Sequence, residues 1–209
     1  MPRIVRSQNP PLHGNYKKYK PYLRIDFLRR CAYCHMPEIR FGGSRNFAVE
    51  HFQPKKLFPT LRSDYSNLYY ACNTCNDFKG AHWPTEEEWN QGRTFVDPCL
   101  TAMSDHIDID ATGTASPRTP AGRYTAAHLN LDREHLKLWR ACKRKLEQRL
   151  ADLEAEIAEI EADAGLLGLP RATPLLASLK QFSVHLRNDL VTEYANWWES
   201  GYPPNTARK

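Results

Sequence analysis

Two pairs of closely spaced cysteines constrain this 209-residue chain more than any other feature of its sequence. One pair lies in the sequence CAYC and the other in CNTC, with 37 residues between them. Each C-x-x-C turn supplies two thiolates, so the two turns together supply the four soft ligands of a tetrahedral Zn²⁺ ion. We therefore predict a structural zinc site, with a redox dithiol or two disulfides as alternatives. The predicted ligands are Cys31, Cys34, Cys72 and Cys75.

The rest of the composition is typical of a globular protein. Hydrophobic residues make up 41% of the chain and charged residues 25%, which is enough apolar surface for a core. No stretch reaches the roughly 18 to 20 uninterrupted apolar residues of a membrane helix, and the first residues lack the apolar core of a signal peptide. We therefore expect a cytoplasmic protein that does not contact a membrane, in which Cys99 and Cys142 are unpaired thiols.

Basic residues are concentrated near the N-terminus. The formal net charge is +5, but residues 1–62 alone contain 13 Lys and Arg against 3 Asp and Glu. Within this stretch the sequence YKKYK, residues 16–20, interleaves tyrosines with lysines. Cations neutralise phosphates and aromatic rings stack on bases, so this pattern predicts nucleic-acid binding. A solvated basic arm is the alternative.

The segment between the cysteine pairs contains a group of candidate catalytic residues. An apolar, strand-like run, FAV, ends at Glu50 and His51, a carboxylate followed directly by an imidazole. Asn67 then precedes a second apolar run, LYYA, which leads into the second cysteine pair. Asn76 is expected near the N-cap of a short helix that ends near Gly80. The predicted order is strand, strand, helix, with a zinc site joining the two ends.

This arrangement resembles the HNH endonucleases of the ββα-metal type, and the resemblance covers residues 31–80. It implies that His51 is the general base, that Asn67 is the middle residue of the motif and that Asn76 occupies the position of the last histidine. Glu50 stands where the family usually has an aspartate that binds the catalytic ion. The chain thus departs from the family pattern at two positions, with Glu for Asp and Asn for His.

The same residues fit the chemistry of phosphodiester hydrolysis. A neutral imidazole such as that of His51 can take a proton from water at physiological pH. Glu50 and Asn76 offer oxygen ligands for a catalytic Mg²⁺ or Mn²⁺ ion. We expect Asn67 to hold its loop and to orient His51 by hydrogen bonding.

Several further residues have two interpretations. Lys55, Lys56 and Lys79 are candidates for contacts with the phosphates of a nucleic acid, or they are simply solvated. His82 is either an additional metal ligand or a surface histidine.

The second half of the chain has a different character. Residues 96–131 are rich in Ser, Thr, Pro and Gly and are expected to form an irregular connector, with a short hairpin in the sequence HIDIDATGTA. Apolar residues at spacings of three and four predict a long helix from Asp132, a break from Gly165 to Pro174 and a second helix with a stripe from Leu175 to Trp197. We expect the two helices to form an antiparallel hairpin, whose apolar stripe is either the core between the helices or a surface that binds a partner or a second copy of the chain.

The sequence therefore predicts an α+β fold, in which a zinc-stapled ββα-metal module is followed by a mainly helical C-terminal hairpin. The expected divisions are a basic and aromatic arm at residues 1–25, the nuclease module at 26–95, the connector at 96–131 and the helical hairpin at 132–209.

The motifs DPC and LNL, which follow the second cysteine pair, also resemble HNH proteins of bacterial anti-phage systems. These include the nuclease partners of P-loop ATPases in Septu-type and retron-linked systems. The resemblance implies a role in defence and an ATPase partner, which must be another chain because this sequence contains no G-x-x-x-x-G-K-[ST] motif.

Two functions from different classes follow from the sequence. One is a metal-dependent endonuclease that acts on DNA, with RNA as an open alternative substrate. The other is a catalytically silent, zinc-stapled subunit that binds nucleic acid or serves as a scaffold. The combination of Glu50, His51, Asn67 and Asn76 favours the enzyme, since a scaffold needs the cysteines but not these four residues.

Overall fold

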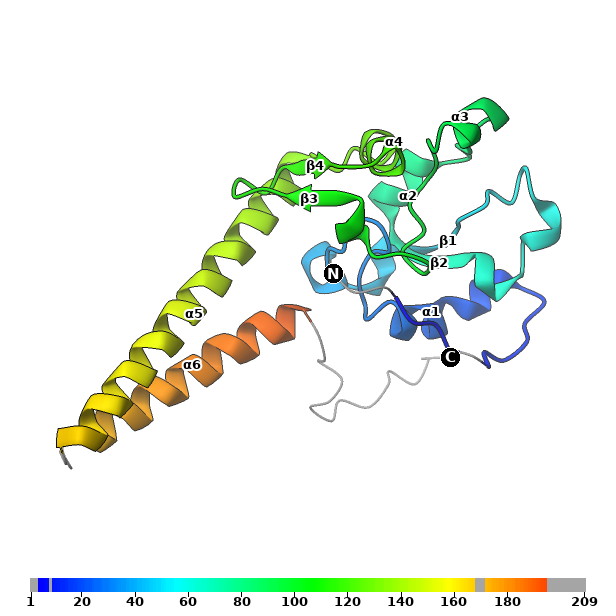
Figure 1. Ribbon diagram of the computed structural model, residues 1–209. Coiled ribbons are helices and arrows are strands. Elements are labelled where there is room, and N and C mark those ends of the chain that lie inside the picture. The colour runs from blue at the N-terminus through cyan, green and yellow to red at the C-terminus, as the bar shows by residue number, and fades with distance from the viewer. Residues whose placement is uncertain (1–3, 8, 168–171, 195–209) are drawn as a thin grey trace. The chain divides into compact units, whose positions relative to one another are not determined.

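The computed structural model describes residues 4–7, 9–167 and 172–194 of the chain. These residues belong to two compact units, Met1–Arg140 and Ala141–Lys209. The helices are α1 (Lys20–Asp26), α2 (Asn73–Lys79), α3 (Glu86–Asn90), α4 (Pro120–His128), α5 (Glu134–Leu167) and α6 (Ala172–Tyr194), and the strands are β1 (Phe47–His51), β2 (Leu68–Cys72), β3 (Ile107–Ile109) and β4 (Ala115–Pro117) (Figure 1).

The centre of the first unit is a ββα arrangement, as predicted. Strands β1 and β2 pair antiparallel, with Phe47 opposite Cys72 and His51 opposite Leu68. Helix α2 follows β2 directly, and its N-cap is Cys72, whose sulfur accepts a hydrogen bond from the backbone N–H of Cys75 at 3.4 Å. The expected N-cap at Asn76 was therefore wrong, because a cysteine sulfur fills the role that usually falls to a side-chain oxygen.

Within the expected basic and aromatic arm at residues 1–25, the part from Tyr16 onward packs against the folded core. A 3₁₀ turn, Tyr16–Tyr19, leads into α1, and both Tyr19 and Leu23 are almost fully buried. Because these large side chains alternate with lysines, the segment buries its apolar face and leaves its cations at the surface.

The stretch expected to be an irregular connector is also largely ordered. The predicted hairpin is present as β3 and β4, which pair antiparallel. Helix α4 was not predicted, although its start has a recognisable signal: the Thr119 side chain accepts a hydrogen bond from the N–H of Gly122, and Pro120 occupies the first turn. Tyr124 and Leu129 then pack into the core.

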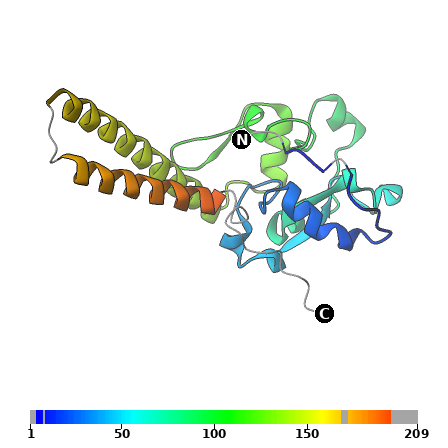
Figure 2. The same cartoon turned by 90° about the horizontal axis from the view of Figure 1, so that it is seen from below.

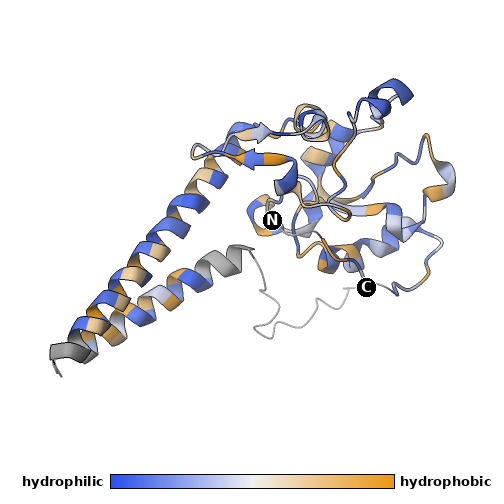
Figure 3. Cartoon of the chain, in the orientation of Figure 1, coloured by the Kyte–Doolittle hydropathy of each residue, from blue (hydrophilic) through white to orange (hydrophobic). Residues whose placement is uncertain are grey.

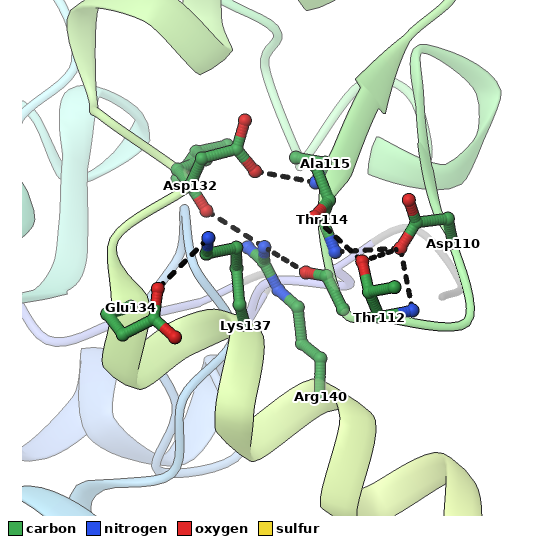
Figure 4. A network of polar contacts seen from close by, with 10 residues as sticks. Asp110, Thr112, Thr114, Ala115, Asp132, Glu134, Lys137 and Arg140 are labelled. Carbon is green, nitrogen blue, oxygen red and sulfur yellow. Dashed lines mark hydrogen bonds and ion pairs between the residues drawn. The ribbon is translucent and has the colours of Figure 1, made fainter.

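The turn of the β3–β4 hairpin lies against the first turns of α5 (Figure 4). The carboxylate of Asp110 accepts hydrogen bonds within the turn, one of them from the N–H of Thr112 at 2.8 Å. Arg140 donates to the carbonyl of Gly113 at 3.1 Å. Gly113 has a φ of +85°, and a Cβ atom at this position would lie 2.1 Å from the carbonyl oxygen of Lys137.

We predict that Gly113→Ala strongly destabilises the first unit. The substitution forces a side chain into the left-handed region, at a cost of about 1–2 kcal/mol, and overpacks the contact with α5, at a cost of about 1–3 kcal/mol. Gly43→Ala is the matched control, since Gly43 has a similar φ of +89° but no atom within 4 Å of the added Cβ. Urea unfolding should show the larger loss for Gly113→Ala, and equal losses would contradict the steric contact.

The second unit contains the remainder of α5 and α6, which lie side by side and antiparallel (Figures 1 and 2). Ion pairs join Glu154 to Arg187 and Glu161 to Lys180. Hydrophilic residues alternate with hydrophobic residues along α5 (Figure 3). The helical C-terminal part is thus confirmed, whereas Trp197 of the expected stripe lies outside the described residues. Helix α5 also continues past Gly165.

Candidate active site and metal centre

The four cysteines of the two C-x-x-C turns lie together in the interior. All four are buried and free of disulfides, and their sulfur atoms lie within 4.8 Å of one another. The sulfurs of Cys34 and Cys72 are 3.9 Å apart. Tetrahedral Zn²⁺ with bonds of about 2.3 Å requires sulfur separations of about 3.8 Å, so this ligand set fits zinc. Among the described residues it is the one group of three or more His, Cys, Asp or Glu side chains that could hold a metal ion.

An arginine from outside the cysteine segments contacts this cluster. The guanidinium of Arg133, just before α5, donates a hydrogen bond to the sulfur of Cys75 at 3.1 Å. The same guanidinium carbon lies 5.1 Å from the centre of the Phe78 ring on α2. Four thiolates and one Zn²⁺ ion carry a net charge of −2, so a cation at this position stabilises the zinc-bound form.

We predict that Arg133→Met weakens zinc binding by about 10- to 100-fold, the usual effect of losing a residue that contacts a metal ligand. Methionine keeps much of the apolar stem and removes the charge and the hydrogen bond. Arg123→Met is the matched control, because Arg123 is an exposed arginine on α4. Competition with a chromogenic zinc chelator measures both affinities, and unchanged affinity in Arg133→Met would contradict this role.

A cavity of about 570 Å³ lies beside the ββα arrangement and brings together residues that the sequence singled out. Glu50 and His51 reach it from β1, and Asn76 reaches it from α2. Lys55 and Lys56, both exposed, line it from the loop that connects the strands. Three further lining residues come from the YKKYK segment, which the sequence predicts to bind nucleic acid but does not place beside His51: Tyr16, Lys17 and Lys20.

One nitrogen of the His51 imidazole forms a hydrogen bond with the backbone. Its Nε2 atom lies 2.9 Å from the backbone carbonyl oxygen of Arg62. Because a carbonyl can only accept, we assign the proton to Nε2, which leaves Nδ1 as the basic nitrogen. Burial lowers the pKa of His51 below its usual value, and the nearby charge of Lys55 lowers it further, although the hydrogen bond to Arg62 opposes both effects. The lowered pKa favours the neutral form of the ring.

Asn67 is tied to the loop between the strands. Its side-chain oxygen accepts from the N–H of Gln53 at 2.7 Å, and its amide nitrogen donates to the carbonyl of Gln53 at 2.9 Å. We expected Asn67 to hydrogen-bond to His51, but the imidazole donates to the Arg62 carbonyl instead. Asn67 closes the loop on which Arg62 lies, so its influence on the imidazole is indirect.

The carboxylate of Glu50 is buried and oriented by two neighbours. One oxygen forms an ion pair with the ammonium of Lys79 at 2.7 Å, and the other accepts from the hydroxyl of Tyr33 at 2.6 Å. Lys79 also donates to the backbone carbonyl of His51 at 3.0 Å. Because Lys79 is fully buried, it cannot contact a phosphate at the surface, which corrects our expectation for this residue.

His82 lies apart from the cavity, in agreement with its interpretation as a surface histidine. It is exposed, and its ring lies edge-on to that of His128 with centroids 5.5 Å apart.

Among the residues that the structure describes, no helix is both long and apolar enough to cross a membrane.

Two comparisons with known proteins match the segment that contains the cysteine cluster and the cavity, or a larger part of this chain. Residues 31–82 match the family model described as HNH endonuclease, which confirms the resemblance found in the sequence. The chain is also similar to the Septu protein PtuB of Bacillus thuringiensis, with 33% identity over 102 residues. That alignment covers 46% of this chain and 36% of the relative, so the chain matches about a third of the relative's length.

Proposed function

We propose that this chain is a metal-dependent endonuclease that hydrolyses phosphodiester bonds in DNA. The observation that carries the proposal is the convergence of Glu50, His51 and Asn76 on one cavity bordered by Lys55 and Lys56. A carboxylate, a neutral imidazole and an amide are the groups that this reaction needs, and the flanking lysines suit a polyanionic substrate.

In the proposed reaction His51 is the general base. Its Nδ1 atom takes a proton from the attacking water, while the hydrogen bond from Nε2 to Arg62 fixes the plane of the ring. General-base catalysis of this kind contributes a factor of about 10² to 10⁴ to the rate. Lys55 and Lys56 are proposed to neutralise the phosphates on either side of the bond that is cleaved.

Glu50 and Asn76 are the residues that would hold the catalytic Mg²⁺ or Mn²⁺ ion. Their donor atoms fit, since these hard cations take oxygen ligands and are often bound through one or two side chains plus substrate phosphate and water. A carboxylate has about four lone-pair positions, so the bonds from Lys79 and Tyr33 leave capacity for a metal. The ion, when bound, supplies Lewis-acid stabilisation of the phosphate and the leaving oxygen.

The substrate class can be tested with end-labelled oligonucleotides of one sequence, prepared as duplex DNA, single-stranded DNA and RNA. Zinc-loaded protein should cleave DNA when Mg²⁺ or Mn²⁺ is added. Cleavage of RNA alone would contradict the assignment to DNA. Binding of all three without cleavage in either ion would favour the alternative of a silent nucleic-acid-binding subunit.

A role in anti-phage defence is proposed on the similarity to the Septu protein PtuB. In this setting we infer that a P-loop ATPase controls the nuclease. We assign the ATPase to another chain, because this sequence contains no P-loop motif. The helical hairpin at residues 132–209 is the proposed site for that partner or for a second copy of this chain.

A further inference from the structure

An aromatic residue that precedes the family-matched segment contacts the proposed general base. Tyr16 lies in the 3₁₀ turn Tyr16–Tyr19, outside residues 31–82. Its ring meets the imidazole of His51 nearly edge-to-face, with centroids 4.7 Å apart and an interplanar angle of 67°. The contact joins residues 35 positions apart, so it depends on how the N-terminal segment folds onto the cavity.

The same tyrosine also contacts cations from the loop between the strands. The ammonium of Lys55 donates to the Tyr16 hydroxyl at 3.1 Å and lies 4.8 Å from the ring centroid. The guanidinium carbon of Arg62 lies 5.8 Å from that centroid. The hydrogen bond from Lys55 lowers the pKa of Tyr16. The Tyr16 side chain therefore contacts three groups around the cavity: the imidazole of His51, the guanidinium of Arg62 and the ammonium of Lys55.

The turn that presents Tyr16 is anchored on both sides. The side chain of Asn15 caps it by accepting from the N–H of Lys17 at 3.0 Å. The carbonyl of Gly14 accepts from the hydroxyl of Ser63 at 3.1 Å, which ties the turn to the same loop that contains Arg62. Tyr19, at the end of the turn, is buried in the core. The position of the Tyr16 ring is thus set by the fold.

We propose that Tyr16 is a positioning residue of the cleavage site, whose ring orients the imidazole of His51 and whose hydroxyl holds Lys55 where it meets a phosphate of the substrate. The inference rests on the proposed nuclease function. It assigns two separable tasks to one side chain, because the ring acts on the chemical step through His51 and the hydroxyl acts on substrate binding through Lys55.

Two substitutions separate these tasks. Tyr16→Phe keeps the ring and removes the hydroxyl, so we expect KM for DNA to rise a few-fold while kcat is retained. Tyr16→Leu removes the ring, and we expect kcat to fall by about 10- to 100-fold, in line with the cost of misplacing a catalytic group by about 1 Å. Tyr22→Leu is the matched control, a half-exposed tyrosine on α1 that does not line the cavity.

The experiment measures kcat and KM for duplex DNA with zinc-loaded full-length proteins of equal thermal stability. In parallel, NMR of protein with ¹³C-labelled histidine records the imidazole resonances of His51, assigned with His51→Gln. We expect a ring-current shift at His51 in the wild type and in Tyr16→Phe that is lost in Tyr16→Leu and kept in Tyr22→Leu.

The outcomes distinguish this inference from the proposed function. Equal kcat in the wild type and Tyr16→Leu, or a His51 resonance that Tyr16→Leu does not move, would overturn the role of Tyr16 while cleavage itself stands. A wild-type protein that cleaves no nucleic acid would refute the nuclease, and with it the catalytic meaning of Tyr16, whatever the NMR shows about the contact.

Discussion

His51→Ala is expected to reduce DNA cleavage by about 10² to 10⁴-fold, the contribution of a positioned general base. The physical reason is that the substitution removes the one neutral imidazole that lines the described cavity, and with it the acceptor for the proton of the attacking water. The rate is measured under conditions in which the substrate saturates the protein, so that the loss reports on the chemical step rather than on binding.

The matched control is His82→Ala, because His82 is an exposed histidine that lies outside the cavity. It should cleave at the wild-type rate. His51→Ala should retain zinc, a cooperative thermal transition and affinity for DNA. If His51→Ala instead loses zinc or the fold, His51 is a structural residue and its assignment as the base is wrong.

Cys72→Ser is expected to abolish the folded state of the first unit. Cys72 offers one of the four clustered thiols, ends β2 and caps α2, so its loss would remove a zinc ligand at the junction of the strand and the helix. Structural zinc in small domains contributes folding free energy of about 10–16 kcal/mol, which is comparable to or greater than the total stability of a typical domain. Circular dichroism and metal analysis of the purified variant should show lost structure and substoichiometric zinc.

Cys142→Ser is the control for this substitution, since Cys142 is exposed and is not one of the four clustered cysteines. It should have wild-type stability and one zinc ion per chain. A Cys72→Ser protein that remains folded and active after zinc is removed would contradict a structural role for zinc at the four cysteines.

The centre of the fold could be predicted from the sequence because its signals are local. Apolar runs that end at His51 and begin after Asn67 define β1 and β2, and the C-x-x-C spacing defines the metal cluster. Each apolar run and each C-x-x-C turn involves residues within a few positions of one another, where strand periodicity and turn geometry apply directly, and the shared ligand chemistry of the two turns predicts that they meet.

The environment of the site could not be predicted, because it depends on contacts between distant parts of the chain. The partner of the His51 imidazole is a backbone carbonyl, for which residue identity gives no signal. Lys79 looks like a surface cation in sequence, and its burial is understandable only once Glu50 is known to lie beside it. The placement of Tyr16 against His51 likewise follows from the packing of the turn Tyr16–Tyr19 against the loop between the strands.

The most direct test of the central claim is conversion of supercoiled plasmid DNA by purified, zinc-loaded protein with and without Mg²⁺ or Mn²⁺. Leaving out the second ion is preferable to adding a chelator, which would also strip the structural zinc. We predict nicked or linear plasmid in the presence of the second ion, and intact plasmid without it. Cleavage that proceeds equally in both reactions, or none in either from folded protein, would contradict a metal-dependent nuclease centred on Glu50, His51 and Asn76.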